Sequence, residues 1–207
     1  MMPSHLLFRA SGLITATLAL SLLAGCLDSA PPYDDAKAAW RDFDGAKAYE
    51  HVTTIVAMGP RPPGSETLEK SRVLIEEHLR SHGWQVRRQT FTGKTPNGPV
   101  EFSNLRARFA ASDSDALWKS PVKVLMCSHY DTKWYRDLTF VGANDPGSSL
   151  AALLETARAL GQHPDLAKHI ELVFFDGEEA FGPNITTSDG LYGSRQYGRE
   201  VLRPLKP

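Results

Sequence analysis

Val122-Lys-Val-Leu-Met-Cys127 and Ile170-Glu-Leu-Val-Phe-Phe175 are the two stretches that decide the fold class. Both are short, apolar and rich in β-branched or aromatic residues, which is typical of strands buried on both faces of a sheet. Between them, residues 148–160 place leucine and alanine on one helical face. This order predicts a right-handed parallel βαβ unit. The fold class that we expect is therefore α/β, with a mixed, mostly parallel sheet sandwiched by helices.

Two helices are predicted upstream of this unit. Asp44 is placed to cap a helix over residues 46–57, where apolar residues recur at the spacing of one helical face. Ser65 is placed to cap a second helix, which Gly83 ends. Both helices are expected to be scaffold.

A hairpin is predicted between these helices and the βαβ unit. Residues 84–91 and 102–109 alternate polar and apolar side chains, as half-exposed strands do. Thr95-Pro-Asn-Gly-Pro99 lies between them and is rich in turn-forming residues. We expect this hairpin at an edge of the sheet.

The composition excludes several classes of protein. The chain has 207 residues, of which 42% are hydrophobic and 23% charged, as in a soluble globular protein and unlike a disordered or collagen-like one. The 23 basic and 24 acidic residues give a net charge of −1, so nucleic acid is not an expected partner. Two cysteines are too few for a disulfide framework.

The N-terminus has the features of an export signal. Residues 1–25 hold a short basic start and an apolar run too short to span a bilayer. Leu23-Ala-Gly-Cys26 resembles the bacterial lipoprotein box, which implies cleavage before Cys26, acylation of its thiol and a membrane tether over residues 26–43. The residue after Cys26 is Leu27 and not aspartate, which resembles lipoproteins of the outer membrane and implies a position in the cell envelope, facing the periplasm. The alternative is a plain signal peptide with a chance cysteine.

Candidate site residues follow the two predicted parallel strands. His129 and Asp131 follow the first, Asp145 precedes the helix, and Glu178 and Glu179 follow the second. Because parallel strands end at one edge of a sheet, these residues are expected to lie together. Crowded carboxylates repel one another, and His with carboxylates suits zinc. Taken singly, each has a structural alternative, as a strand-end histidine, a helix cap or a solvated charged turn.

Four segments of this region resemble one family. They are His129-Tyr-Asp131, Gly142-Ala-Asn-Asp145, Phe174-Phe-Asp-Gly-Glu-Glu179 and Leu191-Tyr-Gly-Ser-Arg195. Together they look like the zinc aminopeptidase and glutaminyl-peptide cyclotransferase family, and the resemblance covers about residues 46–204.

The resemblance implies a role for each candidate residue. Asp145 and Glu179 correspond to zinc ligands, in sites of one or two zinc ions, and His129 to the ligand of a second zinc in the peptidases. Glu178 corresponds to the general base or acid, and Asp131 to the residue that orients His129. The implied substrate is a peptide or protein N-terminus.

Within the family, three longer segments look more like the cyclotransferase branch, which forms N-terminal pyroglutamate: His129-Tyr-Asp-Thr-Lys133, Phe174-Phe-Asp-Gly-Glu-Glu-Ala-Phe181 and Asp189-Gly-Leu-Tyr-Gly-Ser-Arg195. A hydrolytic aminopeptidase and a catalytically inactive envelope lipoprotein are the alternatives. The family supplies its last histidine ligand near the end of a longer chain, and this sequence has no histidine after His169. We therefore expect residues 44–207 to be the N-terminal part of the domain. Loss of later strands would leave residues 170–175 with an exposed apolar edge.

Overall fold

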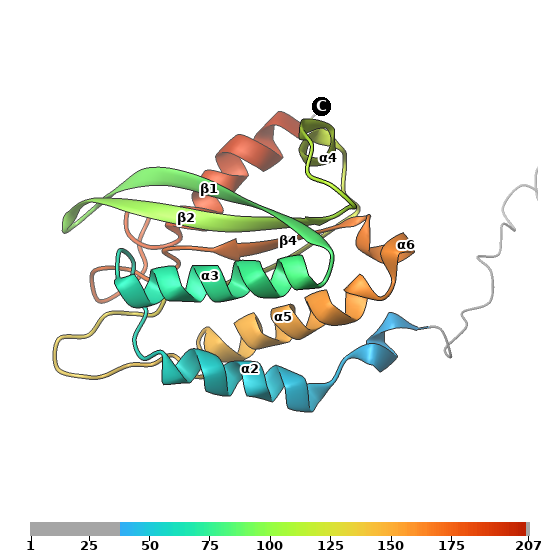
Figure 1. The fold of residues 1–207 in the computed structure, drawn as a ribbon. Helices are drawn as coiled ribbons and strands as arrows, with labels where there is room; N and C mark the ends of the chain where they lie inside the picture. Colours follow the sequence, from blue (N-terminus) through green and yellow to red (C-terminus); the bar gives the residue numbers. More distant parts are fainter. Residues whose placement is uncertain (1–37, 206–207) are drawn as a thin grey trace, which may run out of the picture. The chain divides into compact units, whose positions relative to one another are not determined.

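The computed structural model describes residues 38–205. They form an α/β unit around one four-stranded sheet, with strand order β1-β2-β4-β3 (Figure 1). The strands are β1 (Trp84–Thr95), β2 (Gly98–Phe109), β3 (Val124–His129) and β4 (Ile170–Phe175). The helices are η3 (Ala39–Asp42), α2 (Gly45–Ala57), α3 (Glu66–Ser81), α4 (Asp115–Lys119), α5 (Gly147–Gly161), α6 (Pro164–Ala167), α7 (Tyr192–Tyr197), η4 (Gly198–Leu202) and η5 (Arg203–Leu205).

The sheet is mixed, as predicted, but it is mostly antiparallel. β3 and β4 form the predicted parallel pair, joined through α5. The predicted hairpin of β1 and β2 also forms, and its second strand pairs antiparallel to β4. The expectation of a mostly parallel sheet was therefore wrong, because the hairpin adds two antiparallel pairings to the single parallel pairing of the βαβ unit.

The two strands of the parallel pair have environments that differ from those that we expected. β4 lies between β2 and β3, so its edge is covered and Leu172, Val173 and Phe174 are fully buried. β3 is the edge strand of the described sheet, and its Val124 is 46% exposed. Cys127, predicted to be buried inside a strand, lies in β3 but is exposed. The apolar run alone did not reveal which strand lies at the edge.

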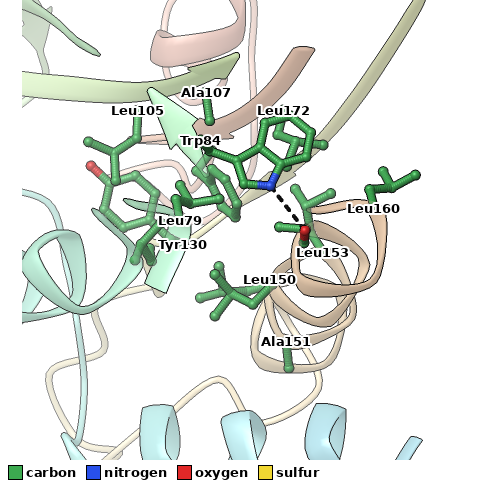
Figure 2. Packing of buried hydrophobic residues seen from close by; sticks show 14 of the residues in the cluster. Leu79, Trp84, Leu105, Ala107, Tyr130, Leu150, Ala151, Leu153, Leu160 and Leu172 are labelled. Atoms are coloured by element: carbon green, nitrogen blue, oxygen red, sulfur yellow. Dashed lines mark hydrogen bonds between the residues drawn. The ribbon is translucent and has the colours of Figure 1, made fainter. Parts of the chain in front are cut away.

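The core lies between the sheet and the helices α3 and α5 (Figure 1). α2 packs on α5, and α7 contacts β2. Trp84 is 1% exposed at the centre of this core, and its indole Nε1 donates a hydrogen bond to the carbonyl of Ala157, 3.0 Å away (Figure 2). This bond satisfies the one polar atom of the side chain, so the whole ring can be buried. The bond therefore joins α5, the helix between the two parallel strands, to β1 of the hairpin.

Both predicted helix caps are confirmed. The Ser65 side chain accepts a hydrogen bond from the amide of Leu68 at the start of α3. Asp44 accepts from the amides of Ala46 and Lys47 at the start of α2, at 2.8 and 3.4 Å. These bonds satisfy amides that have no partner within the helix.

Asp44→Ala is expected to lower the free energy of unfolding by about 1 kcal/mol, because it removes the cap of α2. Asp44→Asn keeps an oxygen that can accept the same bonds and should lose only a few tenths of that amount. Urea denaturation of both variants measures the difference. Equal losses in the two variants would show that the cap is not the cause.

A half-buried histidine gives the fold a dependence on pH. His78 of α3 bonds through Nε2 to the carbonyl of Leu154 in α5, 2.9 Å away, and its ring packs on His51 and His82. Burial is the largest influence and lowers the pKa of His78 to about 4. Burial also lowers the pKa of His51. The folded protein therefore favours neutral rings at these two positions.

Stability is expected to fall as the pH drops from 7 to 5. The unfolded chain takes up a proton on His78 near pH 6.5, whereas the folded chain takes it up only near pH 4, so protonation favours unfolding between these values. We expect a loss of about 1 kcal/mol from His78 by pH 5, after allowing for solvent screening of its partly exposed ring. Urea denaturation at both pH values checks this. His78→Gln should reduce the loss, and an unchanged loss would contradict the assignment.

The N-terminal predictions fall outside the described residues. The signal peptide of residues 1–25, the acylated Cys26 and most of the tether of residues 26–43 stay predictions. Asp42, at the end of the predicted tether, already contacts the fold through His163, at 2.6 Å. Within residues 38–205, no helix has the length and apolar character needed to cross a membrane.

Candidate active site

The parallel pair of strands brings the candidate residues to one edge of the sheet, as predicted. His129, the last residue of β3, lies beside Phe175, the last residue of β4. Asp145 lies just before α5, and its Oδ1 is 2.8 Å from Nε2 of His129. Glu178 and Glu179 follow β4 closely enough to interact electrostatically with His129 and Asp145. All four side chains therefore belong to one cluster.

Asp131 is the centre of this cluster and is fully buried. Its Oδ1 accepts a hydrogen bond from the amide of Glu178 at 3.0 Å, and its Oδ2 accepts one from the amide of Glu179 at 3.1 Å. Its Oδ1 is also 3.4 Å from Nδ1 of His129, a charge contact without hydrogen-bond geometry. The role of Asp131 in orienting His129 stays a prediction. Its two hydrogen bonds fix the backbone that carries both glutamates.

Residues 176–182, which we call the glutamate loop, are also held by hydrogen bonds from the start of α7. The amides of Leu191, Tyr192 and Gly193 donate to the carbonyls of residues 178, 177 and 176, at 2.8 to 3.0 Å. Gly177 has a φ of +65°, and a side chain there would collide with the ring of Phe102. The Asp-Gly-Glu-Glu and Leu-Tyr-Gly segments therefore bond to each other through their backbones. The first segment carries the glutamates, and the second stabilises its conformation.

Two further charged residues, Lys133 and Asp189, hold the chain beyond Glu179. Lys133 is 8% exposed, and its ammonium donates to the carbonyls of Ala180 and Gly182, at 2.6 and 2.5 Å. The Asp189 carboxylate accepts from the amides of Phe181 and Gly182, at 3.0 and 2.7 Å. Both residues belong to segments that resemble the cyclotransferase branch, but the sequence indicated no role for either of them.

The electrostatics of the cluster favour a bound positive charge. Burial raises the pKa of Glu178 and of Glu179, and the neighbouring Asp131 and Asp145 add to this effect. Burial alone would lower the pKa of His129, but Asp131 and Asp145 outweigh it and raise this pKa to about 9. A proton on His129 thus compensates part of the negative charge. A cation at the same place would do so more fully.

The donor chemistry of the site fits zinc. An imidazole and two carboxylates, from His129, Asp145 and Glu179, are ligand types that zinc takes in catalytic sites. Nδ1 of His129 is also buried without a hydrogen-bond partner. In residues 38–205 as they stand, however, no three such side chains converge on a point that could hold a metal. Nε2 of His129 contacts Asp145 directly.

Known proteins with similar sequences belong to one family. Residues 107–206 match Peptidase family M28. The bovine glutaminyl-peptide cyclotransferase-like protein is 38% identical over 148 residues, which are 65% of this chain and 36% of that protein. The glutaminyl-peptide cyclotransferase of Gloydius blomhoffii is 35% identical over 163 residues, or 71% and 42% of the two chains. The chain thus spans about two fifths of these curated relatives, and its incompleteness stays a prediction.

Solved structures agree with this assignment. The glutaminyl cyclase of an Acidobacteriales bacterium matches with a TM-score of 0.65 and 32% identity, over 78% of this chain and 54% of that one. A Zn-dependent exopeptidase from Parabacteroides distasonis matches with a TM-score of 0.66 and 26% identity, over 77% and 57% of the chains. The fold described above is therefore one that these solved structures share in outline. The chain belongs to peptidase family M28, on its glutaminyl cyclase branch.

Proposed function

We propose that this chain is part of a zinc-dependent enzyme that acts on peptide N-termini and forms N-terminal pyroglutamate. The observation that carries the proposal is that Asp131 accepts hydrogen bonds from the amides of Glu178 and Glu179. These bonds keep the two glutamates beside the pair of His129 and Asp145. The sequence similarity to glutaminyl-peptide cyclotransferases supports the choice of reaction.

Each residue has a distinct part in the proposed reaction. Asp145 and Glu179 would hold zinc, with His129 as a further donor. Zinc, when bound there, would polarise the γ-amide carbonyl of an N-terminal glutamine. Glu178 would take a proton from the α-amine as this amine attacks the carbonyl carbon (Cδ) of the γ-amide, and would return the proton to the departing amide nitrogen, which leaves as ammonia. Burial raises the pKa of Glu178, which is the direction that suits a group that both accepts and returns a proton.

A hydrolytic aminopeptidase is the second candidate. The observation that favours it is the contact of His129 with Asp145, because the resemblance assigns His129 to a second metal in the peptidases. The similarity to the Zn-dependent exopeptidase supports the same choice. A catalytically inactive envelope protein is the third possibility.

Two peptides separate these candidates. The purified chain, supplied with zinc, is incubated with a peptide that begins with glutamine and with one that begins with leucine. Ammonia release from the first supports the cyclase, and free leucine from the second supports the aminopeptidase. Glu178→Gln is the control for contaminating enzymes. Neither product, from a chain that is folded and binds zinc, would contradict both enzymatic proposals.

We also propose that the mature protein is anchored in the bacterial envelope, at the outer membrane, through acylated Cys26. The support is the Leu23-Ala-Gly-Cys26 sequence. Cys26→Ser is expected to abolish palmitate labelling and to move the protein out of the membrane fraction, because it removes the acyl acceptor. A mutant that still incorporates palmitate would exclude this site of attachment.

A further inference from the structure

A closed ring of buried hydrogen bonds joins the two segments that carry the candidate site residues. Arg72 of α3 donates through Nε to the Tyr130 hydroxyl and through Nη2 to Oδ2 of Asp176, both at 2.6 Å. The Tyr130 hydroxyl donates to the carbonyl of Ser103 in β2 at 2.5 Å, and the amide of Ser103 donates to the same Oδ2 of Asp176 at 2.7 Å. All four residues are buried. We call them the Arg72 ring.

The Arg72 ring includes neighbours of the site residues. Tyr130 lies between His129 and Asp131, and Asp176 is the first residue of the glutamate loop. The pairing of β3 with β4 ends just before Tyr130 and Asp176, so this ladder does not extend to the glutamates. Arg72 bonds to both segments at once. Its side chain therefore connects them beyond the end of the strand pairing.

Stability alone does not explain why a charged pair occupies this position. A buried ion pair such as that of Arg72 and Asp176 often stabilises a protein no more than apolar side chains of the same size would. Hydrogen bonds have preferred directions, however, which apolar contacts lack. A ring of such bonds can therefore fix the relative position of the segments that it joins.

The shape of the arginine side chain suits this role. Nε and Nη2 belong to one planar guanidinium group, so the two oxygens that they bond are held side by side. Lysine would keep the positive charge, but its single ammonium has no fixed fork of donors. Arg72→Lys is therefore a change of geometry at constant charge.

We propose that Arg72 is a positioning residue, which fixes the glutamate loop relative to the segment that carries His129 and Asp131. The use of this placement rests on the proposed function, because it is Glu178 and Glu179 that would transfer the proton and bind zinc. The placement itself is a property of the folded chain. Asp131 bonds to the amides of the two glutamates, and Arg72 bonds to the first residue of their loop from the side of α3.

Hydrogen exchange in the full chain without zinc tests this inference. The amides of Glu178 and Glu179 bond to Asp131 in the other segment, so their exchange rates report on whether the two segments stay together. In Arg72→Lys we expect these two amides to exchange faster by a factor about tenfold larger than that for the amides of α2. NMR measures the rates of individual amides.

Arg88→Lys is the matched control. Arg88 of β1 shares the carboxylate of Glu69 with Arg72, and its other bond is to Glu76, on the same helix as Arg72. The substitution and the shared partner are therefore the same, but the Arg72 ring stays intact. We expect no excess of exchange at Glu178 and Glu179 in this variant.

Each outcome decides the inference. An excess in Arg72→Lys that Arg88→Lys lacks supports it. Equal acceleration in the glutamate loop and in α2 would show that Arg72 only stabilises the fold. Unchanged exchange, or the same excess in both variants, would likewise overturn the inference.

A second variant covers the case in which Arg72→Lys does not fold. Tyr130→Phe removes the hydroxyl that Nε of Arg72 bonds and keeps the aromatic group, so it decides by the same comparison. These rates need neither peptide nor zinc. A chain that converts neither peptide would therefore count against the proposed function, while the exchange rates still decide the role of Arg72.

Discussion

In a protein that contains the complete family length, Glu178→Gln is expected to lower the turnover of a Gln-initiated peptide by a factor of about 10² to 10⁴ while zinc stays bound. Glutamine has nearly the size of glutamate and can still form hydrogen bonds, but it cannot accept and return a proton. The amide of Glu178 would still bond to Asp131, so the loop should keep its conformation. Steady-state kinetics and elemental analysis of the same sample measure the two effects.

Glu179→Gln is the matched control, because the two side chains are adjacent and the change is the same. An amide is a weaker zinc ligand than a carboxylate, so this variant should lose bound zinc and lose activity as a consequence. Excess zinc should restore part of the activity of Glu179→Gln and none of that of Glu178→Gln. Equal loss of zinc from both variants would exclude the proposed division between them.

Local features of the fold could be predicted closely from the sequence. β4 has the predicted bounds of residues 170–175, and Asp44 and Ser65 are the caps that the sequence indicated. Strand runs and helix caps depend on neighbouring residues, which is why a single sequence contains them. The meeting of His129 with Asp145 could also be predicted, because both lie in the connection from β3 to α5, at the carboxyl end of the parallel pair.

Features that depend on distant pairing could not be predicted. The run that forms β3 is as apolar as that of β4, but β3 lies at the edge of the described sheet and leaves Cys127 exposed. Its environment is decided by the hairpin, which covers the other side of β4. The roles of Lys133 and Asp189 could not be predicted for the same reason, because these residues bond to carbonyls and amides of a distant loop.

Asp131→Ala is expected to lower the free energy of unfolding by about 3 to 5 kcal/mol, since each buried bond to a charged group contributes about 1.5 to 3 kcal/mol. The two bonds in question run from the amides of Glu178 and Glu179 to the carboxylate. The loss of charge brings a compensating gain, because Asp131, second to burial, raises the pKa of Asp176 by repulsion. That gain is smaller, since Asp176 keeps its ion pair with Arg72 at 2.6 Å. Urea denaturation at pH 7 measures the net loss.

Two further variants separate the hydrogen bonds from other effects of the change. Asp131→Asn keeps one acceptor oxygen but turns an amide group toward the second backbone N–H, so it should cost about half as much as Asp131→Ala. Asp137→Ala, in an exposed part of the same loop, should change stability by less than about 0.5 kcal/mol. Because Asp131 holds the backbone of both glutamates, Asp131→Asn should also weaken zinc binding, although Asp131 is not proposed as a ligand. A variant that unfolds more easily but binds zinc with unchanged affinity would show that Asp131 stabilises the fold without positioning the site.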